Sequence, residues 1–122
     1  MVQVFSTKKI GIIATGSELV EPGTIPERGE IRNSNAWQLM AQIRSLGYEP
    51  VYFGLAEDHP QTILNLAKKA LTECDILLMT GGASVGEYDH VSDVLEGLGF
   101  SIKFNKVAIQ PGKPVAFAVK ET

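Results

Sequence analysis

Cysteine, positive charge and long apolar runs are all scarce in this chain of 122 residues. Its single cysteine, Cys74, excludes a disulfide framework and a thiolate zinc site built within one chain. Eleven Lys and Arg against fourteen Asp and Glu give a net charge of −3, which argues against nucleic-acid binding and against adhesion to anionic membranes. A small anionic ligand is still compatible with this balance, because a few local cations or backbone N–H groups can bind one.

Apolar runs such as residues 76–79 are far too short to span a bilayer. The first residues lack the apolar stretch of a signal peptide, so we expect a cytoplasmic protein. The length fits one domain, and an apolar fraction of 44% is enough for its core.

Strand-like and helix-like stretches alternate along the chain. Apolar residues at helical spacing follow the capping residues 33–35, and two further helices are expected after Asp58-His59-Pro60 and after Asp89-His90. Residues 17–30, rich in Gly, Pro and charge, predict a loop or small excursion. The predicted strands are residues 9–15, 49–55, 75–80, 100–107 and 115–119.

This alternation predicts an α/β fold, a three-layer αβα sandwich with a mostly parallel sheet. Ligands of such sheets bind outside the carboxyl ends of the strands. We therefore expect the site on the loops that follow the strands, which are residues 16–18, 57–58, 81–89 and 106–114.

The glycine-rich loop 81–86 is the strongest physical signal. Its glycines can expose backbone N–H groups, and with Ser84 they could cradle an oxyanion such as phosphate or molybdate. A tight turn without a ligand explains the glycines equally well. The loop is neither a Walker loop nor a GxGxxG dinucleotide fingerprint.

Three carboxylates, Glu18, Asp58 and Asp89, fall on the same predicted end of the sheet, where they could hold Mg²⁺. For both aspartates, helix capping is the more common alternative. Lys106 and Lys113 beside a Pro-Gly-Lys-Pro turn could neutralise an oxyanion, or could be ordinary solvated lysines.

Three capping-type residues at 33–35 exceed what one helix needs, so one of them is a candidate to face a ligand. Neither His59 nor His90 has a His or Cys partner, so neither is interpreted as a metal ligand. Trp37 is predicted to pack beside the apolar helix face, and Cys74 to be buried or half-buried.

Four segments in register resemble the molybdopterin-binding (MoaB/MogA-like) domain of MoeA-type molybdopterin molybdenumtransferases. They are TGSEL at 15–19, IRNSN at 31–35, GGASVGEYD at 81–89 and KVAIQPGKP at 106–114. Together they cover nearly the whole chain. The RNSN and PGKPVAF stretches are most similar to the MoeA type rather than to MogA-type or CinA-like proteins.

The resemblance implies a transferase of molybdenum-cofactor biosynthesis. It binds adenylylated molybdopterin, promotes its hydrolysis and inserts molybdate with Mg²⁺. The residues that match catalytic positions of the family are Glu18, Asp58, Asp89 and Lys106, of which Asp58 and Asp89 are the implied metal ligands. Those that match molybdopterin-binding positions are Thr15, Gly16, Asn33, Ser34, Gly81, Gly82, Ser84, Gly86 and Lys113.

Two alternatives stay open. One is a MogA-type molybdopterin adenylyltransferase, and the other is a non-catalytic ligand-binding module of the same fold. Gln110 stands where family members often carry Lys or Arg. The loss of this cation should weaken oxyanion binding or indicates a different substrate emphasis. We interpret residues 1–122 as a single domain of a longer MoeA-type protein, for which the resemblance implies a dimer and a MogA-type partner.

Overall fold

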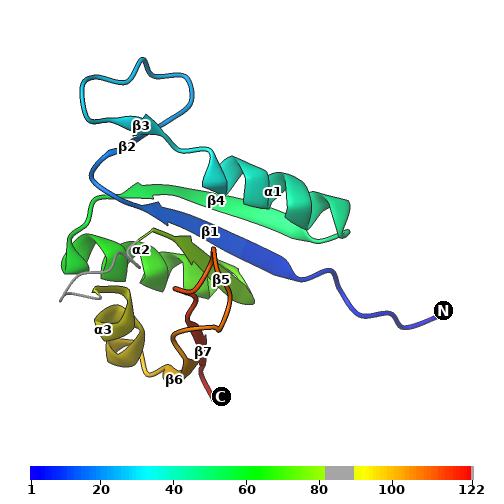
Figure 1. The fold of residues 1–122 in the computed structure, drawn as a ribbon. Coiled ribbons are helices and arrows are strands. Elements are labelled where there is room, and N and C mark those ends of the chain that lie inside the picture. The colour runs from blue at the N-terminus through cyan, green and yellow to red at the C-terminus, as the bar shows by residue number, and fades with distance from the viewer. Residues whose placement is uncertain (82–89, 122) are drawn as a thin grey trace.

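A computed structural model describes residues 1–81 and 90–121. Three helices and seven strands occur in these residues (Figure 1). The helices are α1 (Asn35–Ser45), α2 (Pro60–Glu73) and α3 (His90–Gly97). The strands are β1 (Lys9–Thr15), β2 (Leu19–Val20), β3 (Ile31–Arg32), β4 (Glu49–Ala56), β5 (Ile76–Thr80), β6 (Ser101–Phe104) and β7 (Phe117–Val119).

The main sheet has three parallel strands in the order β4-β1-β5. β1 lies in the centre, where Ile10 pairs with Pro50 on one side and with Ile76 on the other. A strand covered on both faces needs apolar residues on both, which is why β1 reads as an uninterrupted apolar run. The carboxyl ends of all three strands therefore lie at one end of the sheet (Figure 1).

One helix covers one face of this sheet and two helices cover the other. Ile12 and Ala14 of β1 pack with the buried residues of α1, whereas Ile13 packs with those of α2 and with Val94 of α3. Both isoleucines are fully buried. The predicted three-layer αβα sandwich is confirmed, with two separate apolar cores on either side of β1.

The helix ends follow local sequence signals. Gly47 has φ +82° directly after the C-cap of α1, the left-handed conformation that closes many helices. His59 occupies the N-cap of α2 in an extended conformation, and Pro60 begins the helix. Cys74, which ends α2, is half-buried as predicted, and burial raises the pKa of its thiol.

The last two predicted strands form a different structure from the one expected. β6 and β7 are shorter than residues 100–107 and 115–119, and they pair antiparallel in a sheet of their own. The turn at 111–114 reverses the chain, and its two prolines cannot donate ladder hydrogen bonds. The Gln110–Pro111 bond is cis, and the rings of Phe104 and Phe117 stack across the pair, 5.6 Å apart.

The excursion at 17–30, predicted as a loop, contains β2 and leads into β3. These two-residue strands pair in parallel through Leu19 with Ile31 and Val20 with Arg32. They close the excursion at its base and deliver the chain to α1 at a fixed point. Among the described residues, no helix is both long enough and apolar enough to cross a membrane.

Candidate functional site at the carboxyl ends of the strands

Three strand ends meet through direct hydrogen bonds. The N–H of Gly16 donates to the carbonyl of Ala56 at 3.1 Å, which joins the ends of β1 and β4. The hydroxyl of Thr15 donates to the carbonyl of Thr80 at 3.0 Å, which joins the ends of β1 and β5. Thr15, Gly16 and Gly81, all predicted site residues, therefore lie together at one end of the sheet.

Gly81 is required there by backbone geometry. It has φ +82°, and a Cβ built on it would lie 2.0 Å from the carbonyl oxygen of Thr15. No L side chain fits at that distance. Thr15 itself is buried, with its hydroxyl engaged by Thr80. These two residues hold the strand ends in close contact and fix where the chain enters the glycine-rich loop.

Glu18 turns back over the end of β1. Gly16 has φ +150°, and a Cβ built on it would lie 2.9 Å from a carboxylate oxygen of Glu18. The absence of a side chain at residue 16 thus leaves room for this carboxylate, which is exposed. An exposed carboxylate directly above a strand end is well placed to meet a ligand or a cation.

Asp58 lies on the adjoining loop. Its N–H donates to the hydroxyl of Ser17 at 3.3 Å, so the loops after β1 and β4 are in contact. The alternative interpretation of Asp58 as a helix cap is wrong, because His59 occupies the N-cap of α2 and no side chain caps that helix. The Asp58 carboxylate is exposed and bonded to none of the described residues. Glu18 and Asp58 therefore present two exposed carboxylates from neighbouring loops.

Asn33 and Ser34 precede α1 and differ in their surroundings. Asn33 is buried, and its amide oxygen accepts the N–H of Ala36 at 3.3 Å while its amide nitrogen donates to Tyr52 at 2.8 Å. Ser34 occupies the N-cap position but makes no capping hydrogen bond, and it is exposed. Of the two predicted ligand contacts, only Ser34 presents its side chain to solvent.

Lys106 and Lys113 lie on the segment that joins β6 to β7. The N–H of Val107 donates to the carbonyl of Lys113 at 2.9 Å, which closes this segment on itself. Both lysines are exposed, as is Gln110. Within residues 1–81 and 90–121, no hydrogen bond or ion pair joins either lysine to Glu18 or Asp58. The structure thus does not bring the lysines to the strand ends by a direct contact.

Four predicted site residues, Gly82, Ser84, Gly86 and Asp89, lie outside the described residues. The predicted metal pair of Asp58 and Asp89 is therefore not tested. In the described part of the chain, no three His, Cys, Asp or Glu side chains gather as a metal site would require.

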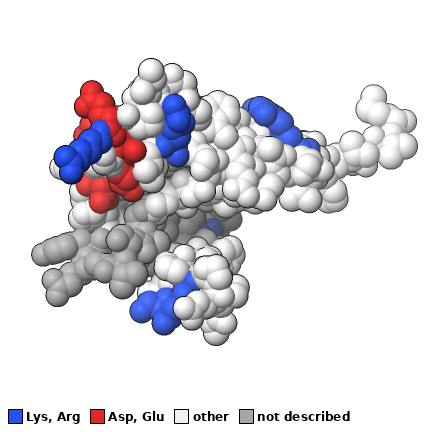
Figure 2. Space-filling model, turned by 45° about the horizontal axis from the view of Figure 1, so that its top comes forward, with Lys and Arg blue, Asp and Glu red and all other residues white. Residues whose placement is uncertain are grey.

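Charge is unevenly distributed between the two ends of the sheet. On the face drawn in Figure 2, acidic side chains gather at the end where β1 and β4 finish in Figure 1, with Lys or Arg side chains beside them. At the opposite end acids are paired with lysines, Lys8 with Asp75 at 2.9 Å and Lys9 with Glu49 at 3.8 Å. Hydrogen bonds from Lys8 and from the backbone of Lys9 lower the pKa of Asp75. Glu18 and Asp58 at the first end form no ion pair with any residue that the structure describes, and such carboxylates suit a cation better than a bare anion.

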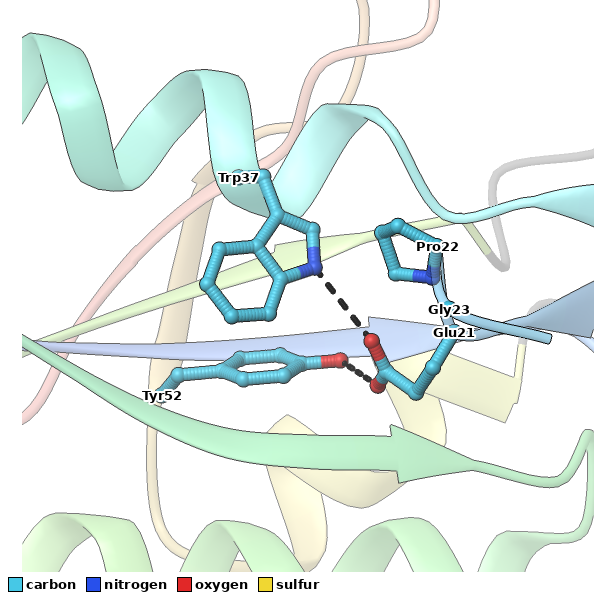
Figure 3. Close-up of a pocket in the computed structure, with 5 residues that line it drawn as sticks. All are labelled: Glu21, Pro22, Gly23, Trp37 and Tyr52. Carbon is cyan, nitrogen blue, oxygen red and sulfur yellow. Dashed lines mark hydrogen bonds between the residues drawn. The ribbon is translucent and has the colours of Figure 1, made fainter.

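The structure also contains a pocket that the sequence did not predict. Glu21, Pro22, Gly23, Trp37 and Tyr52 line a pocket beside the start of α1 (Figure 3). Trp37, predicted to pack against the apolar face, is 45% exposed. Its indole N–H donates to Glu21 at 3.3 Å. The sequence offered one weak signal, an aromatic residue in the first turn of a helix next to the excursion. It could not show that Tyr52 of β4 lies opposite.

Tyr52 is held between two partners in this pocket. Its hydroxyl accepts the amide of Asn33 at 2.8 Å and donates to the second carboxylate oxygen of Glu21 at 2.5 Å. Burial and the hydrogen bond to the Glu21 carboxylate raise the pKa of Tyr52 well above its ordinary value. A tyrosine that resists ionisation beside a carboxylate keeps this hydrogen-bonded chain intact at alkaline pH.

Comparison with known proteins gives a consistent set of relatives. Residues 11–121 match the family model described as "Probable molybdopterin binding domain". The chain is 36% identical over 121 residues to a molybdopterin molybdenumtransferase of Nostoc sp., covering 99% of this chain and 28% of that protein. It is 41% identical over 109 residues to the protein of the same name from Bacillus subtilis, covering 89% of this chain and 25% of that protein.

A solved structure has the same fold. The crystal structure of a molybdopterin biosynthesis MoeA protein from Pyrococcus horikoshii superposes with a TM-score of 0.83 at 36% identity. The match covers 97% of this chain and 29% of that one. This chain thus spans about a quarter of the length of these relatives.

Proposed function

Because the chain belongs to the family described as "Probable molybdopterin binding domain", we propose that it binds molybdopterin or its adenylylated form and takes part in molybdate insertion. In this proposal it acts as one domain of a longer transferase of molybdenum-cofactor biosynthesis. The relatives from Nostoc sp. and Bacillus subtilis are named molybdopterin molybdenumtransferases, which supports molybdate insertion over adenylyl transfer.

One observation carries the proposal for the site: Glu18 and Asp58 expose their carboxylates on touching loops at the carboxyl ends of β1 and β4. Parallel α/β sheets bind their ligands at this end. A neighbouring carboxylate pair also fits Mg²⁺, which takes oxygen ligands and fills its remaining positions with water and substrate phosphates. We assign Asp58, with Asp89, as its ligands and Glu18 as the neighbouring acidic group.

The other predicted residues have distinct roles in this proposal. Asp58 and Asp89 would hold Mg²⁺, which would supply neutralisation of charge on the phosphate and so favour attack of water at its phosphorus atom. Ser34, the glycines 81, 82 and 86, and Ser84 would orient the pterin phosphate, while Thr15 and Gly16 fix the strand end beneath them. Asn33, which is buried just before α1 and accepts the N–H of Ala36, would set the position of Ser34. Lys106 and Lys113 would neutralise molybdate or phosphate as point charges.

Calorimetric titration tests the proposal directly. The chain is titrated with molybdopterin and with adenylylated molybdopterin, with and without Mg²⁺. We expect Mg²⁺-dependent binding of the adenylylated form, weakened about tenfold or more in Asp58→Asn and Glu18→Gln, because each change removes a charge from the site. Glu73→Gln is the matched control, since Glu73 is an exposed acid at the end of α2. Equal losses in all three variants would contradict the assignment.

Turnover separates the proposal from its alternatives. With ATP and molybdopterin, release of pyrophosphate would indicate an adenylyltransferase and contradict molybdate insertion. Binding without any turnover, even in the full-length protein, would indicate a non-catalytic module. The dimer and the MogA-type partner implied by the resemblance, and the cytoplasmic location expected from the sequence, stay predictions beside this proposal.

A further inference from the structure

The pocket beside α1 is built from residues of three parts of the chain. It is a hollow of about 550 Å³ between the excursion, the first turn of α1 and the middle of β4 (Figure 3). None of its five lining residues belongs to the set predicted for molybdopterin or Mg²⁺. It is thus a candidate site in its own right.

The Glu21 carboxylate is fixed in this pocket by two neutral donors. One oxygen accepts the indole N–H of Trp37 and the other accepts the hydroxyl of Tyr52. Asn33 in turn donates to Tyr52, so the hydroxyl proton is directed toward Glu21. This network holds the charged group at one place against the two aromatic rings.

No cation neutralises this carboxylate in the described part of the chain. The ion pairs found there join Lys8 to Asp75 and Lys9 to Glu49, both at the amino end of the sheet. Arg32, which lies just before α1, donates through Nε to the carbonyl of Pro22 at 3.2 Å instead. The pocket therefore combines an uncompensated negative charge with an apolar wall.

The two rings form a corner rather than a slot. Their centroids are 5.5 Å apart and their planes are inclined by 59°. A flat heteroaromatic ring cannot stack on both planes at once, whereas a rounded group can touch both faces. The negative faces of aromatic rings attract cations, and tryptophan does so most strongly.

The geometry points to a binding site for a small quaternary ammonium ion, seated against Trp37 and Tyr52 with its charge facing Glu21. A metal ion would need more oxygen ligands than one carboxylate supplies. A primary ammonium would need several hydrogen-bond acceptors to replace its water, and apart from Glu21 the lining side chains include no carboxylate or amide. A methylated ammonium needs none, because it is held by charge and by contact with the rings.

The chain carries its own reporter for this site, because Trp37 is its only tryptophan. We would follow Trp37 fluorescence, and the single indole N–H resonance by NMR, while adding choline at constant ionic strength. The paired probe is 3,3-dimethyl-1-butanol, which has the same shape as choline without the charge. We expect choline to saturate the signal and the alcohol to bind at least about tenfold more weakly.

Two matched variants test whether the charge of Glu21 is responsible for choline binding. Glu21→Gln keeps the shape of the pocket and should weaken choline binding about tenfold or more. Glu27→Gln, an exposed acid of the same excursion that does not line the pocket, should leave the affinity unchanged. The dispersed NMR spectrum of each variant reports that it is folded.

Three results would overturn the inference. Equal binding of choline and the uncharged alcohol would leave only an apolar hollow. Equal loss in Glu21→Gln and Glu27→Gln would indicate a general effect of net charge. No response of Trp37 to choline in the unmodified chain would show that the pocket does not take this class of ligand, whatever the outcome with molybdopterin.

Discussion

At the scale of single residues, the site depends on close backbone contacts as much as on charged groups. Thr15 and Gly81 bring the ends of β1 and β5 together, and Gly16 makes room for the Glu18 carboxylate. The resemblance implied that Thr15, Gly16 and Gly81 contact the ligand and that Glu18 is catalytic. In the structure Thr15 and Gly81 hold the scaffold, and Glu18 is the group they leave exposed.

Replacing Gly81 tests this close contact. Gly81→Ala should lower the free energy of unfolding by about 3 kcal/mol, since the methyl group meets the Thr15 carbonyl and the left-handed backbone is strained. Denaturant titration measures the change. Gly23→Ala is the control, because a Cβ there meets no atom within 4 Å. Similar losses in the two variants would refute the role of the contact.

The raised pKa of Tyr52 predicts how the free energy of unfolding changes at alkaline pH. Its pKa is raised in the folded state, so its contribution is complete below the ordinary value of about 10 and is lost as pH rises through the folded value. As pH rises from about 9 through this range, the unmodified chain should therefore lose more unfolding free energy than Tyr52→Phe. Tyr48→Phe serves as the comparison, and it should follow the unmodified chain. Parallel curves for all three would contradict the assignment.

At the scale of elements, the sequence predicted what periodicity and end signals can encode. The three parallel strands and α1, α2 and α3 follow from apolar spacing, from Pro60 and from Gly47. The pairing of β6 with β7 did not follow, because strand length and partner depend on the turn at 111–114 and on the Phe104–Phe117 contact. The pocket at Glu21 did not follow either, because its residues meet only after β4 pairs with β1.

At the start of α1, Ser34 occupies the N-cap position, but the side chain that accepts a backbone N–H of the helix is that of Asn33. Asn33→Ala should lower the free energy of unfolding by about 2 kcal/mol, because it removes a buried cap and the partner of Tyr52. Ser34→Ala should change it by less than about 0.5 kcal/mol, since Ser34 makes no capping bond. Thermal or denaturant unfolding compares the pair. The opposite order would show that Ser34 caps the helix in solution.

At the scale of the whole molecule, two cores share one strand. Ile12 belongs to the core under α1 and Ile13 to the core under α2 and α3, and both are fully buried. The strand ends that carry Glu18 and Asp58 are thus supported from both faces. A destabilising substitution in either core should therefore affect the site, because both cores pack on β1.

A double-mutant cycle tests whether the cores are independent. Ile12→Val and Ile13→Val should each lower the free energy of unfolding by about 1 kcal/mol, as expected for one lost buried methyl group. The double variant should equal the sum within about 0.5 kcal/mol, because the two side chains have different neighbours. A larger coupling energy in denaturant titration would mean that the cores pack as one unit.

The central position of β1 also determines when the chain can fold on the ribosome. β1 is made before either of its partners, and the Thr15 hydroxyl meets the Thr80 carbonyl 65 residues later in the sequence. At ordinary rates of protein synthesis this delay is about 3–13 s. Until β5 emerges, one edge of this strand, which is buried from its second residue onward in the finished fold, has no partner and is open to pairing with other chains. The strand that organises the finished sheet is therefore exposed to such pairing while its last partner is still being made.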